Sequence, residues 1–187
     1  AIVDFFEVVV HRVMGELPEL LTGQELEAYE KRRDGLVSES VPEDLARRIA
    51  ALPPAYSILG VVDTAKRDEL DPLEVARVHF TLGEALGLPA LATRILALPR
   101  KDRWQTMARA ALRDELHSVH AQLTAQVLAE TEGGEPAAAR VAAWEKQEDT
   151  AVIRAVATLV EICGDEHADL ARLSVGLRVV RALLAVP

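Results

Sequence analysis

His117 and His120 come closest to a reactive set, because Asp114 precedes them in a stretch of helical periodicity. Residues three apart share one face of a helix. A carboxylate and a histidine at this spacing are typical of helical bundles that hold two metal ions. Such a centre needs a Glu-x-x-His pair on another helix, and the sequence contains none. We therefore interpret the two histidines as solvated or capping residues.

Two other positions have the residue types of nucleophiles. Residues 174–176 (Ser-Val-Gly) form half of a nucleophile elbow, but Arg172 stands in place of the first glycine and no strand precedes the stretch. We expect Gly176 to be a buried small residue that lets two helices approach closely. Cys163 lies on an apolar stripe without a basic activator, so we expect it to be an inert core residue.

Two tryptophans stand beside charged stretches. Residues 100–104 (Arg-Lys-Asp-Arg-Trp) precede a helix, where they could bind an anion. We favour a solvated turn in which Trp104 anchors the helix. Trp144 with the acidic stretch at residues 145–149 likewise predicts one anchor and one exposed face.

Motifs that would hold a nucleotide or a metal are missing from the sequence. It has no G-x-G-x-x-G fingerprint, no Walker loop and no metal motif. The lysines all stand in polar or charged surroundings: Lys31, Lys66, Lys101 and Lys146. The sequence therefore predicts no catalytic, no cofactor-binding and no metal-ligating residue.

The elements that must position these side chains are predicted to be helices. Asp71 begins a helix that Gly87 ends, and a short helix follows to residue 98. Asp102 and Gln105 form a capping-box pattern at the start of a long amphipathic helix. Its apolar stripe comprises Trp104, Met107, Ala108, Ala111, Leu112, Leu116, Val119, Leu123 and Val127. A stripe of this length needs at least two partner helices, which predicts a bundle.

Four helices are predicted before the central stretch. The first ends near residues 15–18, and the second begins at a capping box formed by Thr22 and Glu25 and weakens at Gly35. The third ends at Pro53, and the fourth closes within residues 66–69. The apolar stripes of the first, third and fourth are Ile2, Phe5, Phe6, Val9, Val10 and Val13; Leu45, Ile49 and Leu52; and Tyr56, Leu59 and Val62.

Two helices are predicted after the central stretch. The turn at residues 131–136 leads into one long helix that carries Val141, Trp144, Val152 and Cys163. The last helix begins at Asp169, and its apolar residues are Leu170, Leu173, Leu177, Val180 and Leu184.

Composition limits the class of protein. Of the 187 residues, 50% are hydrophobic, 27% are charged and only 4% are aromatic, which favours helix over sheet. The net charge of −9 disfavours nucleic acid or an anionic membrane as partner. No apolar run reaches the roughly 20 residues of a spanning helix. A single cysteine suits a reducing cytoplasm.

The expected architecture is therefore an all-α bundle of long antiparallel amphipathic helices without a sheet. We expect one domain over residues 1–187, with residues 1–60 as a possible N-terminal subdomain and residues 71–187 as the main bundle. Because the chain begins without Met and already in a periodic pattern, we expect it to be a fragment of a larger chain.

Three segments together resemble the C-terminal end of the large bacterial NAD-specific glutamate dehydrogenases. They are residues 75–88 (VARVHFTLGEALGL), residues 102–116 (DRWQTMARAALRDEL) and residues 169–178 (DLARLSVGLR). The second segment is the most specific. The chain departs from the family pattern at His79, where Tyr is usual, and at Gly176, where Ala is usual, which puts local packing in doubt.

The resemblance implies that the parent enzyme oxidises L-glutamate to 2-oxoglutarate and ammonia and passes hydride to NAD. The family's glutamate-binding lysines and dinucleotide-binding glycines match no position in this sequence. The resemblance therefore implies a non-catalytic helical segment that serves subunit contact, domain bracing or regulation. Its partners would be the other domains and subunits of a homo-oligomer. Two alternatives stay open: a free-standing helical interaction module and a carboxylate–histidine metal bundle.

Overall fold

The computed structural model describes the backbone of residues 2–67 and 69–185 and the side chains of residues 11–55, 57, 58, 60, 61, 65 and 69–185. The expected stripe before Val13, the side chains of Tyr56, Leu59 and Val62, and that of Lys66 lie outside these residues. The described backbone forms nine helices and no strand, which confirms the all-α prediction. The helices are α1 (Ile2–Leu20), α2 (Gly23–Ser38), α3 (Glu43–Arg67), α4 (Pro72–Ala85), α5 (Leu88–Ala97), α6 (Arg103–Glu130), α7 (Ala137–Trp144), α8 (Thr150–Gly164) and α9 (Leu170–Leu184).

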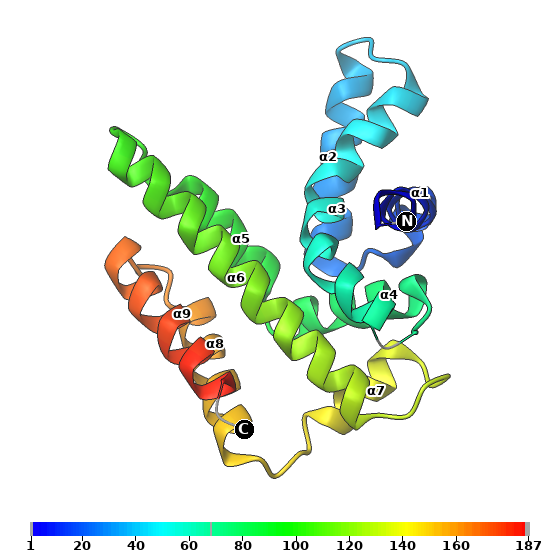
Figure 1. The fold of residues 1–187 in the computed structure, drawn as a ribbon. Helices are drawn as coiled ribbons and strands as arrows, with labels where there is room; N and C mark the ends of the chain where they lie inside the picture. Colours follow the sequence, from blue (N-terminus) through cyan, green and yellow to red (C-terminus); the bar gives the residue numbers. More distant parts are fainter. Residues whose placement is uncertain (1, 68, 186–187) are drawn as a thin grey trace.

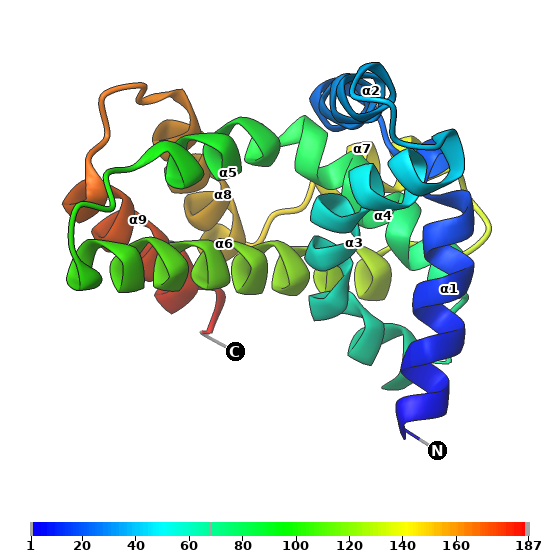
Figure 2. The same cartoon turned by 90° about the horizontal axis from the view of Figure 1, so that it is seen from above.

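The longest helix, α6, is the axis of the structure. Its 28 residues correspond to a rod of about 42 Å. Helices α8 and α9 pack against each other, and α9 lies along one side of α6 (Figure 1). On the other side α2 and α3 form a hairpin with α1 beside it, as the view from above also shows (Figure 2). Helix α4 contacts α1, α3, α5, α6 and α7 and so joins the two sides.

The core gathers around α4 because this helix is apolar on nearly every face. Val75, Val78, Phe80 and Leu82 are each at most 1% exposed. They belong to a contiguous cluster with Leu17 and Tyr29 of the first two helices and with apolar residues of α5 to α9. A helix that is apolar all round is stable only when neighbours cover every side.

Aspartate caps begin the helices where the sequence predicts them. Asp71 accepts a hydrogen bond from the backbone N–H of Leu73, and Asp102 accepts one from that of Gln105. Asp169 accepts one from that of Arg172. Gly87 has φ +72°, which glycine adopts without strain, and it turns the chain from α4 into α5.

Prolines do not end the N-terminal helices, contrary to the sequence prediction. Pro18 lies inside α1, and Pro53 and Pro54 lie inside α3, which continues to Arg67. Gly35 likewise lies inside α2. A proline costs a helix about 3 kcal/mol in isolation, but α3 packs against α1, α2, α4 and α6. Tertiary packing therefore outweighs the local preference.

The apolar stripe predicted for the third helix faces outward. Leu45, Ile49 and Leu52 are 47%, 39% and 57% exposed, whereas Ala46, Ala50 and Ala51 are buried. Helix α3 contacts α1, α2, α4 and α6, and Arg32 of α2 donates to the carbonyl of Ala50 on the alanine face. The hydrophobicity of the side chains therefore predicted the wrong face of α3 as the buried face.

The long helix predicted after residue 136 is broken in two. Helix α7 ends at Trp144, and the backbone N–H groups of Lys146 and Gln147 donate to the carbonyls of Ala143 and Trp144 in a tight turn. Asp149 then caps α8 by accepting from the backbone N–H of Ala151 at 2.8 Å. The cap begins a new helix because its carboxylate satisfies backbone donors that a continuous helix would not expose.

Arg140 ties α7 to α4 and α6 and is only 2% exposed. Its Nη1 donates to Oε1 of Glu74, and its Nε donates to Oγ1 of Thr131 at 2.8 Å. Its Nη2 donates to the carbonyls of Leu128 and Thr131 at 3.1 and 3.3 Å. One guanidinium therefore satisfies the last carbonyls of α6 and an acidic residue of α4.

Candidate functional site

His120 is buried, so the solvated role predicted for it is wrong. Its ring stacks on that of His79, with centroids 3.5 Å apart and planes 17° apart, and its Nε2–H donates to the His79 carbonyl at 2.8 Å. Gly83 makes room for the ring, because a Cβ at this position would lie 2.8 Å from Cε1 of His120. The contact forms because α4 packs against α6. The spacing of residues within α6 does not predict this packing.

The hydrogen bonds assign the tautomers of the histidine pair. The Thr124 hydroxyl donates to the His120 carbonyl at 2.8 Å, so its oxygen accepts from Nδ1–H of His79 at 3.0 Å. Nε2 of His79 is then an unprotonated acceptor, buried and without a hydrogen-bond partner among the described residues.

Both stacked rings are neutral. Burial lowers the pKa of His79 well below 6.5, and the neighbouring His120 and His117 lower it further. Burial also lowers the pKa of His120 to about 4, against the opposing effect of its hydrogen bond to the backbone of His79. Such values make the pair a poor proton carrier near neutrality. Its evident role is to join α4 to α6.

The residues proposed as metal ligands do not converge. Asp114 pairs with Arg113 at 2.9 Å on the exposed side of α6. His117 is half-buried, and burial lowers its pKa. In the part of the chain that the structure describes, no group of three or more His, Cys, Asp or Glu side chains is placed to hold a metal ion.

The two nucleophile candidates lie on different sides of the α8–α9 pair. Burial raises the pKa of Cys163 to about 11, against the opposing effect of Arg94 of α5, which supports the inert interpretation. Ser174 lies at a hollow between α6 and α9 that Leu112 and Arg178 also line. A Cβ on the half-buried Gly176 would lie 2.3 Å from Cδ1 of Ile162, so the predicted close helix approach is confirmed. Neither Cys163 nor Ser174 has the surroundings of an activated nucleophile.

The two tryptophans differ. Trp104 is 75% exposed, so its predicted anchoring role is wrong, whereas Trp144 is 2% exposed and anchors α7 as predicted. Trp104 lies in the first turn of α6, directly after the connection from α5. The stretch at residues 145–149 is mostly exposed, as predicted.

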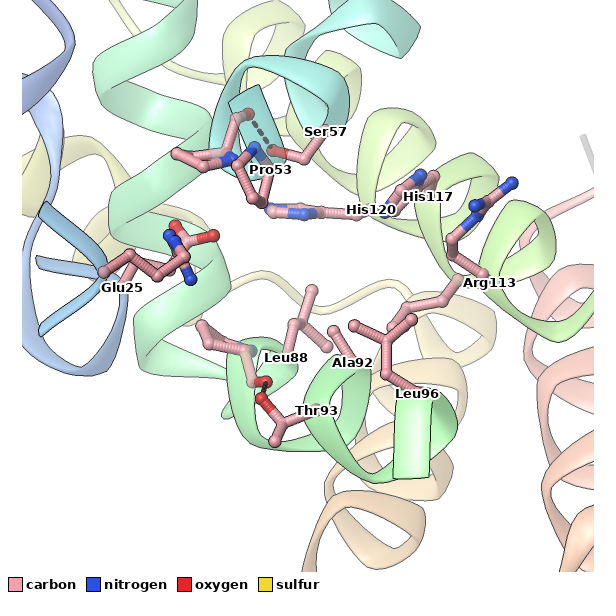
Figure 3. A pocket seen from close by; sticks show the side chains of 14 residues that line it. Glu25, Pro53, Ser57, Leu88, Ala92, Thr93, Leu96, Arg113, His117 and His120 are labelled. Carbon is pink, nitrogen blue, oxygen red and sulfur yellow. Dashed lines mark hydrogen bonds between the residues drawn. The ribbon is translucent and has the colours of Figure 1, made fainter. Parts of the chain in front are cut away.

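A cavity of about 330 Å³ lies between α2, α3, α5 and α6. Its walls are mainly apolar, and Figure 3 shows Leu88, Ala92 and Leu96 of α5 facing His120 of α6 across it. Glu25 reaches into it from α2, while the guanidinium of Arg113 turns away from its centre (Figure 3). An apolar hollow of this size with a few polar groups is typical of small-molecule sites.

Glu25 does not form the capping box that the sequence predicts. Thr22 makes no side-chain capping bond, and the backbone N–H of Gln24 donates instead to Oε2 of Glu84 at 3.3 Å. Burial, together with the charge of Glu84, raises the pKa of Glu25 to about 7, against the lowering effect of Arg32. Glu84 of α4 therefore caps the start of α2, and the side chain of Glu25 lines the cavity.

Arg32 is the basic group on the same wall of the cavity as Glu25. Its Nη2 donates to the carbonyl of Ala50 at a long 3.4 Å. Its Nε is buried and has no hydrogen-bond partner within the described ranges. Burial lowers the pKa of Arg32, and Glu25 opposes that change. Sequence reasoning missed both residues, because the charged run around Arg32 is typical of a solvated helix face.

Large apolar side chains are exposed on several outer faces. Besides the three on α3, they occur on α2, at the α5–α6 hairpin, on α8 and on α9: Val37, Leu96, Trp104, Met107, Ile153, Val160, Val175 and Val179. Grouped exposed apolar residues mark surfaces that contact other proteins or domains.

Membrane spans were also sought in the described part of the chain. No single helix there is long and apolar enough to cross a membrane, although α4 and α5 pass by length and composition as a pair bent by 74°.

The described residues form an all-α fold with one cavity of about 330 Å³ between α2, α3, α5 and α6 and with several exposed apolar faces. Residues 1–182 match the family model described as glutamate dehydrogenase, C-terminal. The chain belongs to this family, which confirms the resemblance drawn from residues 75–88, 102–116 and 169–178.

Three bacterial relatives carry the name NAD-specific glutamate dehydrogenase. The chain is 36% identical to that of Mycobacterium tuberculosis over 97% of its own length and 11% of the relative. It is 34% identical to that of Pseudomonas aeruginosa over 87% of its length and 10% of the relative. It is 33% identical to that of Halomonas elongata over 76% of its own length and 9% of the relative. The chain thus spans about a tenth of the length of these relatives.

Proposed function

We propose that this chain is the non-catalytic helical C-terminal part of an NAD-dependent glutamate dehydrogenase of the bacterial cytoplasm. The parent enzyme would convert L-glutamate and NAD to 2-oxoglutarate, ammonia and NADH. The observation that carries the proposal is the match of residues 1–182 to the C-terminal family together with the small share of each relative that it covers. The relatives' names supply the reaction, and it comes to this chain as a proposal.

The described residues do not fit NAD. A dinucleotide is held at a glycine-rich turn between a strand and a helix, and the described backbone contains no strand. The cavity is lined by Arg32, Arg113 and Glu25, and no glycine that could form a phosphate cradle is among its lining residues. In this proposal NAD therefore binds elsewhere in the parent enzyme, and no catalytic step is assigned to this chain.

We propose that the outer faces of α3, α8 and α9 pack against other parts of a homo-oligomeric parent enzyme. Leu45, Ile49 and Leu52 recur at helical spacing and are exposed side by side, and Val175 and Val179 do the same on α9. Subunit contact and domain bracing would cover such faces, and regulation could act through them.

We also propose that residues 1–187 form one domain. Helix α3 runs without a break across residue 60, and α4 contacts helices from both parts of the chain. The separate N-terminal subdomain over residues 1–60 stays a prediction.

Deleting this segment from the full-length parent enzyme should impair assembly. We expect the truncated enzyme to form a smaller oligomer in size-exclusion chromatography with light scattering, because apolar faces that fill the contacts are lost. A full-length variant with Ile49→Asp and Leu52→Asp should weaken assembly in the same direction. Arg47→Asp is the control, because the side chain of Arg47 is 57% exposed and lies on the opposite face of the same helix. Unchanged assembly and turnover in both altered enzymes would refute the contact role.

A further inference from the structure

The cavity between α2, α3, α5 and α6 is lined at one end by the carboxyl group of Glu25 and the guanidinium of Arg32. The other polar liners are committed: the Ser57 hydroxyl donates to the carbonyl of Pro54 at 2.8 Å, and that of Thr93 donates to the carbonyl of Pro89 at 3.0 Å. His120 donates to the backbone of His79, Arg113 holds Asp114, and His117 lies beside the opposite charges of Arg113 and Asp114. The recognition chemistry of the cavity therefore rests on Glu25 and Arg32.

Arg32 is placed to receive an anionic group. A guanidinium has five N–H donors in a planar fork that matches a carboxylate. Here Nη2 makes one long bond, and Nε is buried without a partner among the described residues. A buried donor without a partner costs free energy that a bound carboxylate would recover.

Glu25 is placed to receive a cationic group beside that carboxylate. It belongs to the same helix as Arg32, and each charge shifts the pKa of the other group. Burial and the neighbouring Glu84 disfavour the ionised form of Glu25, and an ammonium ion in contact would restore it. The two carboxyl groups also repel a ligand that brings a second negative charge.

The rest of the cavity accepts an apolar body. Its remaining walls are Pro53, Pro54, Leu88, Pro89, Ala92, Leu96 and Leu116, with the neutral ring of His120 between them. Burial of apolar ligand surface against such walls supplies affinity, while the charged end sets orientation.

We propose that this cavity binds a small zwitterion with an apolar body, namely an α-amino acid with an apolar side chain. Its carboxylate lies on Arg32, its ammonium group lies on Glu25, and its side chain lies against Pro53, Leu88 and Leu116. The inference concerns binding alone and does not depend on the role proposed for the chain in a dehydrogenase.

The direct test is calorimetric titration of the full chain with L-leucine. We expect saturable binding, and roughly ten-fold or weaker binding of four probes that each lack one feature or add a charge. Glycine lacks the apolar body, isocaproate lacks the ammonium group, isopentylamine lacks the carboxylate, and L-glutamate adds a second carboxylate. Absence of saturable leucine binding, or equal binding of isocaproate, would overturn the proposal.

Variants locate the site. Arg32→Gln should weaken L-leucine binding at least roughly ten-fold, and Glu25→Gln should do the same while leaving isocaproate unchanged. Arg33→Gln is the matched control, because the neighbouring guanidinium pairs with Asp34 at 2.8 Å. Should Arg32→Gln fail to fold by circular dichroism, Ala92→Phe fills the cavity from α5 and should abolish binding. Leucine binding that survives Ala92→Phe would place the ligand elsewhere and refute the assignment.

Discussion

Replacing Arg140 with alanine is expected to lower the free energy of unfolding of the chain by about 3 kcal/mol. The side chain of Arg140 is 2% exposed and that of its partner Glu74 is 30% exposed. Removing one member of a buried pair typically costs about 3 to 5 kcal/mol, and the partial exposure of Glu74 favours the lower end. The variant also leaves the carbonyls of Leu128 and Thr131 at the end of α6 without their donor.

Urea unfolding followed by circular dichroism measures this effect. Arg47→Ala is the matched control, because Arg47 pairs with Glu43 at 2.8 Å on the surface, with side chains 57% and 64% exposed. An exposed pair one helical turn apart contributes about 0.3 to 0.5 kcal/mol. If the two variants lose similar stability, Arg140 is not the tie between α4, α6 and α7 that its contacts describe.

Replacing Glu25 with glutamine is expected to remove a pH-dependent loss of stability. The pKa of Glu25 is raised from 4.5 to about 7 by burial and by Glu84. The stability contributed by its neutral form is therefore fully present below pH 4.5 and is lost as pH rises through 7. Glutamine stays neutral throughout. The free energy of unfolding of the variant, relative to that of the wild type, should therefore rise by roughly 2 to 3 kcal/mol from about pH 5 to about pH 8.

Other charged groups face Glu25 and must be separated from it. Arg32 lies on the same helix, Glu84 reaches it from α4, and Arg113, His117 and His120 line the cavity from α6. The parts of α3 and α5 that line the cavity bring no titratable side chain within the described residues. Because these groups are present in both proteins, the difference between wild type and variant isolates Glu25.

Urea unfolding at the two pH values gives the difference directly. Glu27→Gln, at an exposed position of the same helix, is the control and should follow the wild type at both. If Glu25→Gln changes stability equally at both pH values, the carboxyl group is solvated and the raised pKa is wrong.

Features decided within a few residues were predictable from the sequence. Asp71, Asp102 and Asp169 cap their helices because a carboxylate reaches backbone N–H groups of the next turn whatever lies beyond. Gly87 turns the chain because only its own backbone conformation is involved. The all-α class and the family follow from the same local patterns repeated along the chain.

Features decided between helices were not predictable. Pro53 stays inside α3 because four other helices pack against that helix, and Leu45 is exposed because α3 buries its alanine face instead. The capping-box pattern at Glu25 is intact in the sequence, yet Glu84 is 60 residues away from the backbone N–H that it caps. The stack of His79 on His120 likewise joins residues 41 positions apart. Most of the candidate site therefore lies beyond reasoning from sequence spacing.

The most direct measurement of the central claim is NADH formation by the purified 187-residue chain with L-glutamate and NAD, beside the full-length parent enzyme at equal molarity. The account predicts turnover by the parent and none by the chain, because the described side chains form exposed apolar faces and a cavity in which we assign no catalytic step. Turnover by the chain alone would contradict the account.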